Sequence, residues 1–181
     1  MTNRTPIQAT QIPENKARSL YPEPFASLVK HRTRRRLGEH FGLANFGVNL
    51  TTLAPGAISA LKHHHSRQDE FIYVLSGTPM LRYGEEEYLM SPGECIGFKG
   101  GSGLAHQLLN HGEVDAVYLE VGDRLAGDTV DYPDDDLALV QGAWPVNHKV
   151  IDTPLRKYLQ ADGERRVRVT TADDPDGMRS I

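Results

Sequence analysis

Histidine and glutamate side chains at short spacing form the part of the sequence best suited to chemistry. His63 and His65 are separated by one residue, and Glu70 follows five residues after His65. Side chains alternate between the two faces of an extended strand, so His63 and His65 point the same way and His64 points the other way. The Cβ atoms of His63 and His65 then lie roughly 6.5–7 Å apart, two rises of about 3.3 Å. Both imidazoles can therefore reach one metal ion.

Two further ligands are expected from neighbouring strands. The polar residues 66–69 suit a tight connection, after which Glu70 opens a strand-like run at 71–75. We expect this strand to fold back on the histidine strand and to bring Glu70 to the same face. The candidate for the fourth ligand is His106, in the segment HQLLN. His111 lies in a turn and is expected to be solvated.

Many short strands are needed to hold these residues in place, and the sequence contains them. Its 17 glycines and 11 prolines favour frequent turns. Strand-like stretches recur about every ten residues between 46–53 and 114–121, with no helix-length pattern between them. The pattern predicts an all-β sandwich or barrel. Further along, we expect a short helix at 155–159 and an edge strand at 165–171.

Two histidine-bearing segments resemble the two sequence motifs of the cupins. The first reads Gly56, six residues, His63-His64-His65, four residues, Glu70, six residues, Gly77. The second reads Gly93, five residues, Lys99-Gly100-Gly101, four residues, His106, three residues, Asn110. Lys99 stands where proline is usual, and the gap before His106 is two residues longer than the commonest form. The resemblance covers residues 43–122 closely.

The resemblance implies an all-β, cupin-type jelly-roll barrel with N- and C-terminal arms. We assign residues 1–42 to the N-terminal arm, 43–125 to the barrel and 126–181 to a C-terminal extension whose residues from 172 onward are mobile. It also implies that His63, His65, Glu70 and His106 bind one divalent transition metal. Three imidazoles and one carboxylate suit Zn, Mn, Fe, Ni or Co.

The family resemblance does not select one reaction, because cupins include isomerases, epimerases, dioxygenases, decarboxylases, lyases, sensors and storage proteins. We expect a metal-dependent enzyme acting on a small oxygen-rich molecule, of the sugar or sugar-phosphate isomerase or epimerase type. An iron-dependent dioxygenase and a non-catalytic ligand-binding or sensor cupin stay open as alternatives. No acid–base pair stands out, so no catalytic residue is assigned. Lys99 is expected at the rim of the site, and Tyr118 and Glu120 share one strand face.

The charge is unevenly distributed along the chain. Residues 1–40 hold eight Lys or Arg and three Glu, a charge of +5. Because the net charge of the whole chain is −4, the remaining residues carry −9. The cluster Arg32–Arg36 lacks a helix-turn-helix pattern or interleaved aromatics, and no nucleic-acid partner is expected. It is expected to form a solvated face or to pair with acidic residues. One such pairing is a dimer strap, in which the cluster docks on the acidic loop at 128–136 of a second copy. Without such docking, we expect the loop at 128–136 to form a solvated cap. A homodimer is therefore expected.

The compartment follows from what the chain contains. Cys95 is the single cysteine, so no disulfide forms within the chain, and a reducing compartment, the cytoplasm, is expected. No run of 18 apolar residues occurs, and the first 30 residues hold no apolar signal segment, so no membrane partner is expected. Cys95 itself is interpreted as a small buried hydrophobic residue.

Overall fold

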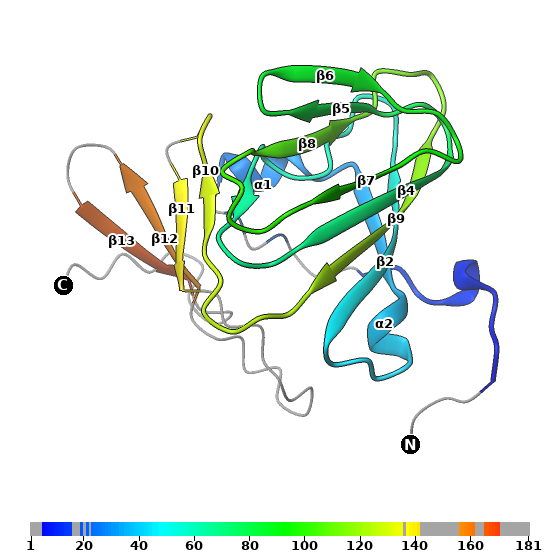
Figure 1. Cartoon of the computed structure of the whole chain (residues 1–181), viewed down its shortest axis with the longest axis horizontal. Helices are drawn as coiled ribbons and strands as arrows, with labels where there is room; N and C mark the ends of the chain where they lie inside the picture. The colour runs from blue at the N-terminus through cyan, green and yellow to red at the C-terminus, as the bar shows by residue number, and fades with distance from the viewer. Residues whose placement is uncertain are drawn as a thin grey trace.

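Thirteen strands and three short helical segments form the described part of a computed structural model of the chain (Figure 1). It describes residues 5–15, 19, 21, 23–135, 137–141, 156–161 and 165–170. The helical segments are η1 (Ala9–Gln11), α1 (Phe25–Leu28) and α2 (Leu37–His40). The strands are β1 (Arg32–Arg36), β2 (Phe46–Leu53), β3 (His64–His65), β4 (Glu70–Ser76), β5 (Met80–Tyr83), β6 (Glu86–Leu89), β7 (Cys95–Phe98), β8 (His106–Leu109), β9 (Ala116–Asp123), β10 (Val130–Tyr132), β11 (Leu137–Gln141), β12 (Arg156–Ala161) and β13 (Arg165–Thr170).

Three antiparallel sheets contain these strands. The largest has the order β1-β2-β9-β4-β7, and two smaller ones have the orders β13-β12-β11-β10-β3 and β6-β5-β8. Isolated bridges between His63 and His106 and between Ile58 and Leu109 join the chain just before β3 to β8. The two smaller sheets are thereby linked at the histidines, and Figure 1 shows them at the left and the top of the large sheet.

Alternation along β4 explains how the large sheet builds the core. Ile72 and Val74 are buried, whereas Phe71, Tyr73 and Leu75, on the other face, are about 40% exposed. The inward residues pack with Leu53 of β2, Tyr118 of β9, Leu81 of β5 and Leu108 of β8. Each fully buried aliphatic side chain of this kind contributes roughly 1.5–3 kcal/mol. A smaller cluster consists of Leu61, Val130 and Tyr132 of β10, and Leu137 of β11.

The predicted all-β class is confirmed, but the closed barrel is not. Among the described residues the three sheets do not close on one another into one barrel. The predicted pairing of the Glu70 strand with the histidine strand is wrong, because β4 pairs with β7 and β9 while β3 pairs with β10. The helix expected at 155–159 is also wrong, since β12 occupies most of that range; the edge strand expected at 165–171 is present as β13.

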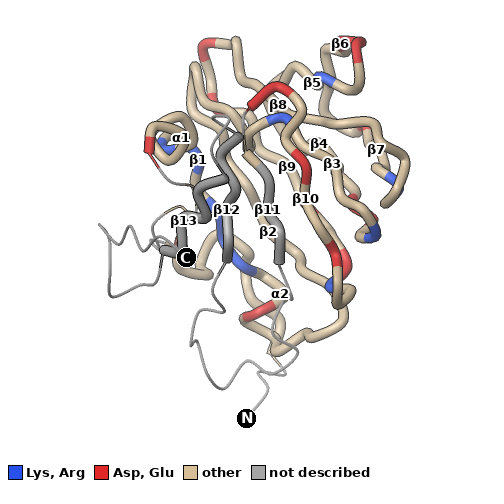
Figure 2. Tube along the Cα trace, turned by 90° about the vertical axis from the view of Figure 1, so that its left-hand side faces the viewer, with Lys and Arg blue, Asp and Glu red and all other residues tan. Residues whose placement is uncertain are grey.

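Strands from both predicted arms pair with the central range. β1 pairs along its whole length with β2, and β10 pairs with β3. The division at residues 42 and 125 stays a prediction, and residues from 172 onward lie outside the described residues. Apart from the run of arginines on β1, Figure 2 shows basic and acidic positions scattered over the trace. No helix within the described ranges is long and apolar enough to cross a membrane.

Candidate metal centre

His63 and His106 face each other across an antiparallel bridge, although 43 positions separate them. The amide of His63 donates to the carbonyl of His106 at 3.1 Å, and the amide of His106 donates back at 2.8 Å. Residues opposed in this way project their side chains to the same side of the sheet. Their ring centroids are accordingly 4.8 Å apart.

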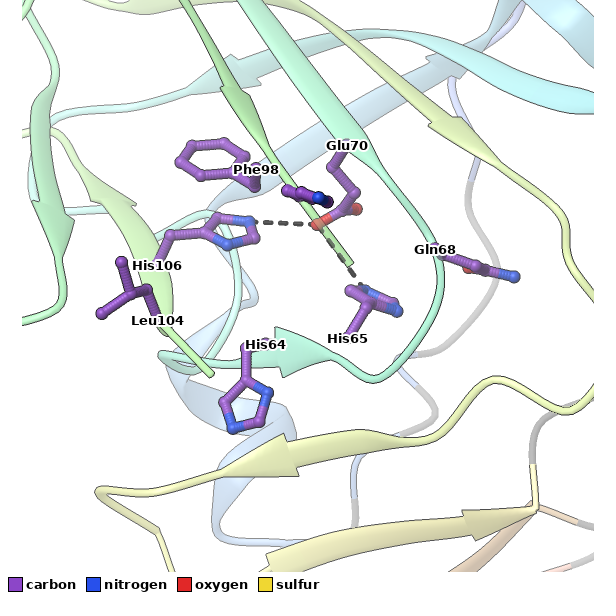
Figure 3. A pocket seen from close by; sticks show the side chains of 8 residues that line it. His64, His65, Gln68, Glu70, Phe98, Leu104 and His106 are labelled. Atoms are coloured by element: carbon purple, nitrogen blue, oxygen red, sulfur yellow. Dashed lines mark ion pairs between the residues drawn. The ribbon is translucent and has the colours of Figure 1, made fainter. Parts of the chain in front are cut away.

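Glu70 places one carboxylate oxygen among three imidazoles. Its Oε2 lies 3.0 Å from Nε2 of His106, 3.6 Å from Nε2 of His65 and 3.7 Å from Nε2 of His63. Figure 3 shows Glu70 between His65 and His106, which come from β3 and β8. The four residues predicted from the sequence are therefore brought together, with the same nitrogen of each imidazole directed at one point.

This donor set fits a divalent cation. One ligand atom each of His63, Glu70 and His106 lies within 4.8 Å of the others, and His65 approaches the same carboxylate oxygen. The four side chains are only 8–20% exposed. Glu70 Oε2 is buried without a hydrogen bond of acceptable geometry, despite the three nitrogens around it. A buried carboxylate oxygen without a hydrogen bond, surrounded by imidazole nitrogens, offers the mixed oxygen and nitrogen ligands that suit a transition metal.

The local electrostatics favour the protonation states that a metal needs. Burial, reinforced by the neighbouring His106, lowers the pKa of His63 to about 3, so its ring is neutral at neutral pH. Burial raises the pKa of Glu70, but the contact with His106 and the charges that the three imidazoles carry when protonated outweigh it and hold this pKa well below its usual range. A neutral imidazole and an ionised carboxylate are the metal-binding forms.

The outer nitrogens of two histidines are fixed by hydrogen bonds. His63 Nδ1 donates to the carbonyl of Leu61 at 2.8 Å, and His65 Nδ1 donates to Oδ2 of Asp128 at 2.6 Å. With the proton on Nδ1, the lone pair of each Nε2 points at the cluster. The third ring, His106, stacks on Phe98 with centroids 3.6 Å apart.

Asp128 is the site residue that sequence reasoning missed. The acidic stretch at 128–136 was expected to be a solvated cap, but the Asp128 side chain is 2% exposed. Besides His65, its Oδ1 accepts from the amides of Arg67 and Gln68, at 2.8 and 3.2 Å, and from the hydroxyl of Ser66. The available signal was the alternation of apolar residues around Asp131, which marks β10 as a strand rather than a loop.

A small pocket with a cavity volume of about 10 Å³ lies beside the cluster. Besides His65, Glu70 and His106, it is lined by His64, Gln68, Phe98, Lys99 and Leu104, which puts Lys99 at the site as expected. The ring of His64 points away from Glu70, with Nε2 3.9 Å from Asp131 (Figure 3). The interpretation of Cys95 as buried is wrong, because it lies on the exposed face of β7.

Comparisons with known proteins concern the family and the fold of the chain. The profile of the cupin domain family matches residues 49–122. A crystal structure of a sugar phosphate isomerase from a cupin superfamily, from Silicibacter pomeroyi, is 31% identical over 93% of this chain and 94% of its own, with a TM-score of 0.72. A protein of Acidithiobacillus ferrooxidans, provisionally named a sugar phosphate isomerase, is 35% identical over 62% of this chain and 71% of its own, with a TM-score of 0.59.

A third solved structure shares the fold alone. This polyketide cyclase from Streptomyces resistomycificus is 21% identical over 66% of this chain and 78% of its own, with a TM-score of 0.54. No protein with a curated description matches the chain.

Proposed function

Because the chain belongs to the cupin superfamily, we propose that it is a metal-dependent enzyme acting on a small oxygen-rich molecule, of the sugar or sugar-phosphate isomerase or epimerase type. The metal ligands in this proposal are His63, His65, Glu70 and His106. The observation that carries it is the convergence of three imidazole nitrogens on one buried carboxylate oxygen beside a pocket.

A divalent ion bound there would supply Lewis acidity, which polarises a carbonyl group or lowers the pKa of a bound water. The chain itself prepares the site for that ion. Leu61 and Asp128 hold the tautomers of two histidines, and the low pKa of Glu70 keeps the carboxylate ionised. Phe98 and Leu104 supply apolar surface to the lining of the pocket.

The isomerase type is favoured over the alternatives by one relative. The Silicibacter pomeroyi protein, named a sugar phosphate isomerase, aligns with nearly the full length of both chains at 31% identity. Within the described residues, neither the iron-dependent dioxygenase nor the sensor has an observation of its own that favours it. We therefore do not propose either of them, and the experiment below distinguishes both from the isomerase.

The proposal is tested by turnover after controlled metal loading. The protein is stripped with a chelator, reloaded separately with Mn, Zn, Ni, Co or ferrous iron, and incubated with aldoses and aldose phosphates while aldose–ketose exchange is followed by NMR. We expect isomerisation that disappears on chelation and in the His106→Ala variant, without uptake of oxygen. Oxygen uptake with iron would replace the isomerase by the dioxygenase, and tight sugar binding without turnover would replace it by the sensor.

A further inference from the structure

The three imidazoles of the cluster are not held in the same way. Nδ1 of His63 donates to the carbonyl of Leu61 at 2.8 Å, and Nδ1 of His65 donates to Asp128 at 2.6 Å. Nδ1 of His106 is also buried, yet among the described residues it has no hydrogen-bond partner. A histidine that binds a metal is normally oriented by a hydrogen bond to the nitrogen that faces away from the ion. The orientation of His106 therefore needs another explanation.

An aromatic ring lies flat against His106. The centroid of the Phe98 ring is 3.6 Å from that of the imidazole, and the two ring planes differ by only 3°. Figure 3 shows the two side chains next to each other at the site. Phe98 is 5% exposed, and the His106 side chain is 8% exposed. At this separation the imidazole cannot tilt out of its plane toward Phe98 without a clash, so the stack fixes the plane in which Nε2 lies.

The register of the strands places Phe98 between two candidate ligands. Phe98 of β7 opposes Glu70 of β4, so both side chains project from the same face of the large sheet. His106 belongs to β8, in a different sheet. The Phe98 ring therefore extends from the sheet that carries the carboxylate to the imidazole that the other sheet supplies.

Phe98 is itself held in place by the side chains around it. The ring of Tyr83 contacts it edge to face, with centroids 5.3 Å apart and planes at 73°, a favourable aromatic geometry. Tyr83 opposes His106 in the pairing of β5 with β8. Phe98 also packs in the main apolar core with Leu81 and Leu108. Apolar packing, rather than a polar contact, therefore fixes the surface on which the imidazole rests.

We propose that Phe98 is the positioning residue for His106. Its ring face takes the place of the hydrogen bond that holds the other two imidazoles, and it keeps Nε2 of His106 directed at the metal. An aromatic face also attracts positive charge, and an imidazole bound to a divalent cation carries part of that charge. The stack thus favours the metal-bound form of the ring. The inference rests on the metal binding of the proposed function, but not on the reaction.

The test compares metal binding by the full chain and three variants. Phe98→Leu keeps an apolar side chain without a ring face, whereas Phe98→Tyr restores the ring face. Val74→Ala is the matched control for lost core packing, because Val74 is 0% exposed in the same core and is not a candidate ligand. Competition with a chelator measures the affinity for zinc, and the absorption spectrum of the cobalt-loaded protein reports the geometry around the ion.

We expect Phe98→Leu to bind zinc about tenfold or more weakly than the wild type and to change the cobalt spectrum. Phe98→Tyr and Val74→Ala should match the wild type in both measurements. Wild-type affinity and spectrum in Phe98→Leu, an equal loss in Val74→Ala, or no recovery in Phe98→Tyr would overturn the proposal.

A measurement on the wild type decides the case in which Phe98→Leu does not fold. With zinc bound, the ring current of Phe98 should shift the ring protons of His106 upfield of those of His63 and His65 in the NMR spectrum. Similar shifts for all three rings would overturn the stack. Sugar turnover is measured on the same samples. Zinc binding with the expected Phe98 effects but without turnover would count against the isomerase alone, whereas a wild type that binds no metal would overturn both.

Discussion

At the scale of single residues, the site depends on where protons are held. Asp128 accepts the Nδ1 proton of His65 and, through its other oxygen, binds the backbone of the following loop. One buried carboxylate thereby orients a candidate ligand and fixes the chain that leads to Glu70. Such outer partners typically change metal affinity 10–100-fold.

Replacing Asp128 with Asn tests that role. We expect metal affinity to fall about 10–100-fold, because the Asn NH2 group that takes the place of Oδ2 is a donor and cannot accept the Nδ1 proton of His65. The fold should persist, since the Asn carbonyl still accepts from the amides of Arg67 and Gln68. Competition titration with a coloured chelator measures the affinity. The control is Asp131→Asn, whose side chain is 59% exposed and beside the outward His64; an equal loss in both variants would count against the assignment.

The four candidate ligands could be predicted from the sequence because each sits in a recognisable local spacing. Asp128 could not, since it lies 63 positions from His65 and meets it only through the pairing of β10 with β3. Tyr118 and Glu120 were predicted to share a face, which the register bears out, but nothing local indicated the arginines across the sheet from them.

At the scale of elements, the connection at 66–69 shows why strand partners were mispredicted. A polar run between two strand-like segments favours a hairpin. In the structure, however, the loop that contains Gly100 and Gly101, after β7, packs against this connection. The amide of Gly101 donates to the carbonyl of His65 at 2.9 Å, and Gly100 to Asp69 at 2.8 Å. These long-range contacts hold the connection open, so β3 and β4 enter different sheets.

Gly100 permits that close approach. A Cβ added there would lie 2.3 Å from the carbonyl carbon of Arg67, so Gly100→Ala must displace the loop that separates His65 from Glu70. We expect the free energy of unfolding to fall by about 1–3 kcal/mol and metal occupancy to fall with it. Chemical denaturation and elemental analysis measure the two effects.

The matched control for this substitution is Gly97→Ala in the neighbouring strand β7. The nearest atom to an added Cβ at Gly97 is the carbonyl oxygen of Glu70 at 3.8 Å, an ordinary contact. We expect stability and metal content close to those of the wild type. If the two alanine variants behaved alike, close packing of the glycine loop would not explain the position of the ligands.

At the scale of the whole molecule, the fold class could be predicted from the sequence, but whether the sheets close into a barrel could not. Period-two alternation along β4 and turns at Gly56, Gly77 and Gly93, all with positive φ, carry the all-β prediction. Which sheets meet depends on contacts far apart in the sequence, such as the bridge between His63 and His106. The arginine cluster was expected to form a solvated face or to pair with acidic residues, with the dimer strap as one such pairing. It forms β1, where Arg34, Arg35 and Arg36 pair with Glu120, Glu14 and Glu39 of the same chain.

The homodimer therefore stays a prediction, with a different surface. Since the arginines have partners within the chain, we predict that two copies meet through the exposed apolar residues of β4, which are Phe71, Tyr73 and Leu75. Sedimentation should show a dimer that is unchanged by high salt and becomes monomeric in Phe71→Glu. Leu89→Glu, at a 63% exposed position of β6, is the control. If high salt dissociated the dimer, the result would instead favour the strap, in which Arg32–Arg36 dock on the acidic loop of the second copy.

The central claim is that three imidazoles and one carboxylate bind a divalent metal, and elemental analysis of the purified chain tests it most directly. We predict about one transition-metal ion per chain in the wild type and in His111→Ala, an exposed histidine outside the cluster. His65→Ala and His106→Ala should each lose that ion while remaining folded by circular dichroism. Unchanged metal content in these two variants, or a metal-free wild type after growth with all five candidate metals, would contradict the account.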